Sequence, residues 1–206
     1  MKRSFLLKTL LVATLATSAF SEDIDAMPGE EYEETTSKAT MQVGLTYGLM
    51  NFGGSLSDES ESIDVDTEDT PLTISFAFLF KNDNKFGFYY KTDELALPNI
   101  SDSGTISTNT FGVLGEVGFS SIKAKIGEGE LLPYFGYGLG YGSAEASWTS
   151  IDLSAFEADL SFGAHYTIQS FEVSAAIYRR AISVFDESDT VTYAMNGINL
   201  GVGYKF

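Results

Sequence analysis

The chain ends on the stretch Ile198-Asn199-Leu200-Gly201-Val202-Gly203-Tyr204-Lys205-Phe206. Every second residue from Ile198 to Phe206 is bulky and apolar, and the residues between them are small or polar, which is the pattern of a β-strand with two different faces. A soluble protein gains little stability from a strand that ends on an exposed aromatic residue. In a membrane barrel the last strand pairs with the first to close the sheet, and a terminal aromatic side chain anchors it at the membrane interface. The ending therefore favours a membrane-spanning barrel.

The N-terminus indicates export. Met1-Lys2-Arg3 is basic, residues 5–19 are largely apolar, and Ala19-Phe20-Ser21 places small residues at the two positions that a signal peptidase reads. The apolar run is too short and too rich in hydroxyl groups for a spanning helix of about 20 residues. We therefore expect a signal peptide, residues 1–21, cleaved after Ser21.

Charge and cysteine content narrow the function classes. Removing Lys2, Arg3 and Lys8 from the 12 basic residues leaves 9 against 29 acidic residues, so the mature chain has a formal charge of −20. Such a charge argues against nucleic acid as a partner. The absence of cysteine excludes disulfides and thiolate metal sites. Residues 22–39 are acidic with almost no large apolar side chain, so we expect a disordered leader there, and one domain over 40–206.

Period-two segments alternate with polar loops from Thr40 onward. They predict eight strands, at about 40–51, 71–80, 85–92, 108–119, 131–143, 154–166, 171–180 and 191–206. One face of each strand is bulky and apolar, and the other is small, polar or charged. An eight-stranded barrel has an interior only just wide enough for side chains, so more than thirty mostly large apolar residues do not fit inside it. We therefore expect the apolar face to point outward into lipid. A two-sheet sandwich that buries the apolar faces stays open as an alternative.

The predicted loops support a membrane barrel. Long and short connections alternate, with 52–70 and 93–107 long and 81–84 and 167–170 short, as in small barrels with short periplasmic turns and longer outer loops. Only 120–130 is longer than expected on the periplasmic side.

These features resemble the small eight-stranded outer-membrane β-barrel family of Gram-negative bacteria, which includes the outer membrane protein A barrel, outer membrane protein X, Ail and the opacity proteins. The resemblance covers about residues 40–206 and rests on the architecture and on the ending Tyr204-Lys205-Phe206. It implies an all-β fold, an eight-stranded antiparallel up-and-down transmembrane β-barrel in the cell outer membrane. It also implies that Tyr204 and Phe206 form the assembly signal, with periplasmic chaperones and the barrel-assembly machinery as partners. We expect no peptidoglycan-binding domain after the last strand.

The acidic loop 64–69 is the one candidate for a cation site. Asp64, Asp66, Glu68 and Asp69 place carboxylates close together, which suits Ca²⁺ or Mg²⁺. The segment is not an EF-hand, because Ser75 stands where the twelfth-position Glu is required. A solvated loop held extended by its own repulsion is the favoured interpretation, and divalent cations stay a weaker one.

Charged residues on the small face predict a polar network inside the barrel. The members are Lys91, Glu116, Glu157, Asp159, Glu172 and Arg180, together with Lys205 as a weaker candidate. Charges in so narrow a space require partners, so we expect an ion-paired plug rather than a conducting path. In the strand around Gly138, alternate glycines would make room for large side chains such as Tyr89 and Tyr178.

His165, the only histidine, is the only candidate catalytic imidazole. Outer-membrane lipases and acyltransferases work at the outer leaflet, whereas His165 falls at the periplasmic end of its strand, and no Gly-x-Ser-x-Gly elbow supports a nucleophile. We therefore expect no enzyme and no cofactor.

The sequence leaves the specific role open between three functions. The favoured one is a monomeric scaffold and adhesion-type protein that meets a surface partner through acidic extracellular loops. A narrow, porin-like pore or conduit for small molecules is the alternative, and a lipid-modifying enzyme is a remote one.

Overall fold

The structure is a computed structural model that describes residues 40–57, 62–65, 71–97, 104–147, 153–186 and 190–206. The expected signal peptide and acidic leader lie outside these residues, as do Asp66, Glu68 and Asp69 of the acidic loop. Contacts divide the chain after Ser37, and the fold described below belongs to the second unit, Lys38–Phe206.

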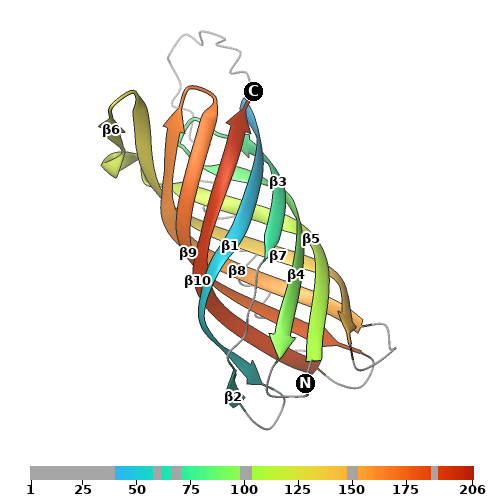
Figure 1. Cartoon of the computed structure of the whole chain (residues 1–206). Helices are drawn as coiled ribbons and strands as arrows, with labels where there is room; N and C mark the ends of the chain where they lie inside the picture. Colours follow the sequence, from blue (N-terminus) through green and yellow to red (C-terminus); the bar gives the residue numbers. More distant parts are fainter. Residues whose placement is uncertain (1–39, 58–61, 66–70, 98–103, 148–152, 187–189) are drawn as a thin grey trace, which may run out of the picture. The chain divides into compact units, whose positions relative to one another are not determined.

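Eight long antiparallel strands form the wall of a closed barrel (Figure 1). They are β1 (Thr40–Ser57), β3 (Leu72–Leu79), β4 (Lys85–Leu97), β5 (Gly104–Gly118), β7 (Gly129–Ala146), β8 (Leu153–Ile168), β9 (Phe171–Phe185) and β10 (Thr190–Lys205). Each strand pairs with its neighbours along the chain, and β10 pairs with β1 from Lys205 opposite Gln42 to Thr192 opposite Ser57. The predicted up-and-down barrel and its closure by the last strand are therefore confirmed.

Two short strands extend this wall as hairpin additions. β2 (Ser62–Val65) pairs with the end of β1, and β6 (Ala124–Ile126) pairs with the start of β7. The described residues also contain one short 3-10 helix, η1 (Ser120–Ile122). No helix in this part of the chain is long and apolar enough to cross a membrane.

The two ends of the barrel differ in their connections. We call the end that carries the C-terminus the turn end, because residues 80–84 and 169–170 make tight connections there. Asp83 and Gln169 adopt the left-handed backbone region within these turns, with φ of 61° and 53°. The opposite end, where β4 leads to β5 and β9 leads to β10, is the loop end.

The longer turn-end connection, 119–128, is tied down by a small polar cluster. Lys123 Nζ lies 3.2 Å from Asp83 Oδ1 and 3.0 Å from Glu130 Oε2, and Ser120 Oγ donates a hydrogen bond of 2.9 Å to Asp83 Oδ2. The hydrogen bond to Glu130, with Asp83 beside it, raises the pKa of Lys123. The connection thus joins the β3–β4 turn to the start of β7, which explains why it is longer than a simple hairpin turn.

The wall has an apolar outer face and a polar inner face over most of its height, as the alternation predicts. Large hydrophobic side chains stand exposed on every wall strand, for example Phe111 at 61% and Phe171 at 64% exposure. Glycines line the inside opposite large side chains. A Cβ atom on Gly140 would lie 2.5 Å from Tyr89 Oη, so the predicted fit of Tyr89 against these glycines is confirmed.

The predicted strand ends are wrong at the loop end, where the strands run further than expected. β1 continues to Ser57, β4 to Leu97, β7 to Ala146 and β9 to Phe185, while β5 begins at Gly104. The inner face at the loop end, in these extensions and in the adjoining ends of β8 and β10, is apolar and packs into one buried cluster, which we call the apolar cap: Leu95, Ile106, Ala144, Ala146, Ala155, Ile182, Val184, Tyr193 and Met195.

On β4 and β7 the outer face of the extensions is polar, which explains why they resembled loops. Glu94 and Glu145 are both exposed there. Beyond a bilayer the wall meets water on its outside, so the apolar side chains of a strand gain by turning inward. The period of two continues through the extension while the polarity of its two faces reverses.

Candidate functional site

Two groups of charged side chains fill the inside of the barrel below the apolar cap. The central cluster consists of Lys91, Asp93, Glu157, Asp159 and Arg180. The turn-end cluster consists of Lys85, Glu116, His165, Glu172 and Lys205. The six predicted network residues all point inward, but the structure divides them, with Glu116 and Glu172 in the turn-end cluster and the other four in the central one.

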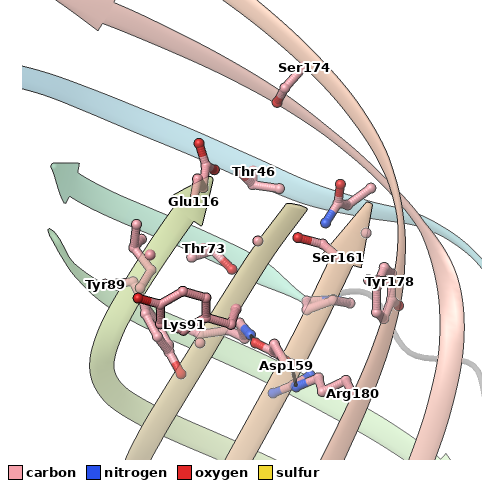
Figure 2. Close-up of a pocket in the computed structure, with 18 of the residues that line it drawn as sticks. Thr46, Thr73, Tyr89, Lys91, Glu116, Asp159, Ser161, Ser174, Tyr178 and Arg180 are labelled. Atoms are coloured by element: carbon pink, nitrogen blue, oxygen red, sulfur yellow. Dashed lines mark hydrogen bonds and ion pairs between the residues drawn. The ribbon is translucent and has the colours of Figure 1, made fainter. Parts of the chain in front are cut away.

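The alternation of three strands positions the central cluster. Lys91 and Asp93 follow one another on the inner face of β4, Glu157 and Asp159 do the same on β8, and Arg180 lies directly opposite Asp159 on β9. Because β4 and β8 are not neighbours in the sheet, their contacts cross the barrel interior. Figure 2 shows Lys91, Asp159 and Arg180 meeting there.

Arg180 holds the central cluster together. Its Nη2 lies 2.6 Å from Glu157 Oε2, its Nε donates to the same oxygen at 3.0 Å, and its Nη1 pairs with Asp93. The side chains of Arg180 and Glu157 are 1% and 0% exposed, so both charges are fully removed from water. Buried charges of this kind depend on each other, because the loss of one partner leaves the other without compensation.

Lys91 completes the central cluster from the opposite side. Its Nζ lies 3.2 Å from Glu157 Oε1, pairs with Asp159, and stands 5.0 Å from the centre of the Tyr89 ring. The Tyr89 hydroxyl donates a hydrogen bond to Glu157. Three carboxylates thus share two basic groups. Asp159 also borders a cavity of about 140 Å³, which is enough space for a few waters at roughly 30 Å³ each.

The turn-end cluster contains two acids and two lysines, with Glu172 at its centre. Lys85 Nζ lies 2.5 Å from Glu172 Oε1 and 3.2 Å from Glu116 Oε2, and Lys205 Nζ lies 3.0 Å from Glu172 Oε2. Gln42 donates a further hydrogen bond of 2.9 Å to Glu172 Oε1. These contacts connect β1, β4, β5, β9 and β10, so the cluster ties the first and last strands to the opposite wall.

His165 lies within the turn-end cluster. Its Nε2 lies 2.8 Å from Glu116 Oε2 and its Nδ1 lies 3.0 Å from Glu172 Oε1, while its ring stacks on Tyr134 with centroids 3.9 Å apart. Both ring nitrogens therefore face carboxylates, and neither of these contacts is with a serine hydroxyl. The short turn between β8 and β9 brings His165 close to Glu172, which explains their contact.

Two cavities lie between the charged side chains. The larger, of about 140 Å³, is lined by Thr46, Tyr89, Lys91 and Asp159 among others, and the smaller, of about 90 Å³, is lined by Gln42, Lys85, His165 and Glu172 among others. They share five lining residues: Thr46, Thr73, Leu114, Glu116 and Ser174. The hydroxyl groups among these residues make the space between the clusters polar.

Sequence reasoning missed Lys85 and Asp93 as members of the network, whereas the pairing of His165 with Glu172 across the short turn could be anticipated. Lys85 has the same parity as Lys91 on β4, so the alternation alone could have placed it inside. Asp93 fell in a predicted loop because β4 was expected to end at residue 92.

The predicted cation candidates stay a prediction. Asp64 lies in β2, and Asp66, Glu68 and Asp69 lie outside the described residues. Within the part of the chain that the structure describes, no group of three or more His, Asp or Glu side chains is arranged to hold a metal ion.

Comparison with known proteins agrees with the barrel. A family model described as an outer membrane protein β-barrel domain matches residues 9–206. No curated protein matches the chain. Similar solved structures include Neisserial surface protein A, at 11% identity and a TM-score of 0.47, covering 81% of this chain and 96% of that one.

Two further barrels are similar to the chain at the same level. Ail, the attachment invasion locus protein of Yersinia pestis, shares 13% identity with a TM-score of 0.39, covering 82% of this chain and 99% of that one. The N-terminal β-barrel domain of Pseudomonas aeruginosa OprF shares 14% identity with a TM-score of 0.41, covering 80% and 97%.

Proposed function

The chain belongs to the small eight-stranded outer membrane protein β-barrel family, and we propose that it acts as a structural scaffold and surface-interaction protein. The observation that carries this proposal is the filled interior. The turn-end cluster, the central cluster and the apolar cap follow one another along β4, β8 and β9. An ion would have to break two sets of buried ion pairs and then cross the buried apolar cap, whereas conduction needs a path that ions can enter and leave easily.

In this proposal the loop end faces the outside of the cell and carries the interaction. Loops on a rigid barrel are suited to recognition because they can vary without disturbing the wall. The acidic residues Asp64, Asp66, Glu68 and Asp69 would then present negative charge to a partner or to divalent cations. The protein would be monomeric. It would also be non-enzymatic, because the carboxylates beside both ring nitrogens of His165 leave neither nitrogen free to act as a base toward a hydroxyl nucleophile.

Protease treatment of intact cells tests this orientation. A protease added outside should cut within 58–70 or 98–103 and leave the β3–β4 turn at 80–84 intact. Cutting at 80–84 with intact long loops would reverse the orientation, and the surface-interaction role would then fail with it.

Single-channel recording of the refolded protein in planar bilayers tests the scaffold against the pore. We expect no defined ion-selective openings from the wild-type protein. A useful matched variant is Arg180→Met, which weakens the central cluster but leaves the apolar cap unchanged, so it should stay closed as well. Regular openings in the wild-type protein would favour the pore.

One observation favours the narrow pore as a second candidate. The two interior cavities share five lining residues, so a polar space extends from the turn-end cluster to the central cluster. In that case the apolar cap would be the gate, and shortening its side chains at Ile182 and Met195 together should produce openings that the wild-type protein lacks.

A further inference from the structure

The outer face of the barrel carries a largely apolar groove that also has an arginine among its lining residues. It has a volume of about 400 Å³ and lies across β7, β8, β9 and β10. Phe135, Leu160, Phe162 and Ile177 provide its apolar lining, and Arg179 and Asn196 lie among its lining residues as well. We call it the wall groove. Leu160, Phe162 and Ile177 are all at least half exposed, so the groove faces whatever surrounds the barrel.

Arg179 points out of the barrel although both of its chain neighbours point in. Tyr178 and Arg180 are buried inside, and the alternation of β9 turns the side chain between them outward. Arg179 forms no ion pair with any residue that the structure describes. It is also the only basic residue among the described outward positions of the eight wall strands.

The depth of Arg179 matches the level of lipid head groups. It lies eight residues beyond Phe171 on β9, which is about 26 Å along a strand and about 20 Å of height at a tilt near 40°. The apolar band of such barrels is about 25 Å tall. With Phe171 and Tyr204 at the turn-end boundary, the long Arg179 side chain reaches the opposite boundary by extending toward water.

The neighbouring residues place the same boundary at this level. Asn196 lies directly opposite Arg179 on β10, and the next outward residues toward the loop end are Ala181 and Ser183 on β9. The apolar outward run of β9 therefore stops at Ile177, next to the wall groove. A cationic group thus stands at the head-group level directly above an apolar groove at acyl-chain level.

We propose that the wall groove and Arg179 form a binding site for an anionic phospholipid of the surrounding bilayer, one whose phosphate charge is not balanced by a cation in the same head group. One acyl chain fills the groove between Phe162 and Ile177, the lipid phosphate pairs with the Arg179 guanidinium, and the Asn196 amide donates to the same head group. Guanidinium and phosphate fit each other in two parallel hydrogen bonds. The phosphate belongs to a lipid rather than to free phosphate, because the apolar groove continues from the arginine.

The charge of the whole chain makes this one arginine important. With a formal charge of −17, the protein repels anionic lipids at most of its surface. Arg179 supplies a local exception, at the boundary between water and hydrocarbon, where electrostatic attraction is stronger than in bulk water. The proposal rests on the membrane barrel itself and not on the closed interior, so a conducting protein would leave it unchanged.

Native mass spectrometry of the full chain, refolded in uncharged detergent micelles, tests the site. Phosphatidylglycerol and phosphatidylcholine with identical acyl chains are the probes, and their bound fractions are compared at equal concentration. We expect wild-type protein to prefer phosphatidylglycerol by about fivefold, the effect of one favourable basic residue near a lipid surface. Arg179→Gln should lose this preference and Arg179→Lys should keep it, while Lys125→Gln, which removes a base at the turn end, should have no effect.

A second variant tests the binding of the lipid acyl chain separately from the binding of the head group. Ile177→Trp fills the wall groove, so it should reduce the binding of both lipids while the preference between them stays. Excess inorganic phosphate should not displace phosphatidylglycerol. Gel mobility without heating verifies that each variant is folded. Equal binding of the two lipids to wild-type protein, an unchanged preference in Arg179→Gln, unchanged binding in Ile177→Trp, or displacement by phosphate would each overturn the proposal.

Discussion

The lower wall of the barrel and its extension at the loop end follow opposite rules within the same strands. On β9 the outward residues from Phe171 to Ile177 are apolar and the inward residues from Glu172 to Arg180 are largely polar. Two residues later Ile182 and Val184 point inward, and Ser183 points outward. The hydrogen-bonded sheet continues without change. The medium outside the wall therefore decides which face is apolar, and the strand decides only that the faces alternate.

The largest effect is expected from the buried charges of the lower wall. Arg180→Met leaves Glu157 and Asp93 without their main partner, which should lower the free energy of unfolding by about 3–5 kcal/mol. Urea titration of the protein in lipid vesicles measures this difference. As a control, combining Arg180→Met with Glu157→Gln and Asp93→Asn removes the unpaired charges and should restore most of the loss. A loss below about 1 kcal/mol in the single variant would show that these charges are not buried.

The next effect compares the outward faces of the two regions directly. Phe162→Arg puts a charge at the middle of the lipid-facing wall and should cost about 2–4 kcal/mol of unfolding free energy. Glu145→Arg puts the same charge on the exposed outward face of the β7 extension, in water, and should change that free energy by less than about 0.5 kcal/mol. The same vesicle titration applies to both variants. Equal costs at the two sites would remove the distinction between wall and extension.

The smallest effect compares two isoleucines on β9. Ile182→Val opens a small space in the apolar cap and should cost about 0.5–1.5 kcal/mol of unfolding free energy. Ile177→Val lies on the lipid-facing surface, where acyl chains fill the space, so its cost should be smaller. If Ile177→Val were the more damaging variant in matched urea titrations, the apolar cap would not be a packed core.

Much of the barrel could be predicted from the sequence because its wall repeats one local rule. The alternation in each segment indicates a strand, and the size of the apolar face indicates which side is outward. The loop-end extensions were not predicted because the apolar face of each strand points outward in the lower wall but inward in the extensions. Ala144 and Ala146 are small, and exposed polar neighbours such as Glu145 made their segment resemble a loop.

The charged network was predictable only as a set of inward-facing residues. The alternation of side chains along each strand places Glu157 and Arg180 on the inner face. It does not determine which charged residues lie at the same height along the barrel axis. That depends on the tilt and stagger of the closed sheet, which bring Lys91 of β4 against Glu157 of β8 across the interior. The separation into two clusters, and the entry of Lys85 and His165 into one of them, follow from this three-dimensional arrangement.

The reversal of polarity along a single strand is tested most directly by a nitroxide scan of β9. The chain contains no cysteine, so single substitutions at the outward positions Val173, Ile177, Ala181 and Ser183 can each carry one spin label. In lipid vesicles, collisions with oxygen report contact with acyl chains, and collisions with a water-soluble nickel chelate report contact with water. We expect oxygen to dominate at 173 and 177 and the nickel chelate to dominate at 181 and 183. Strong nickel collisions at 173 and 177, equal to those at 183, would contradict a lipid-facing wall that ends at Arg179.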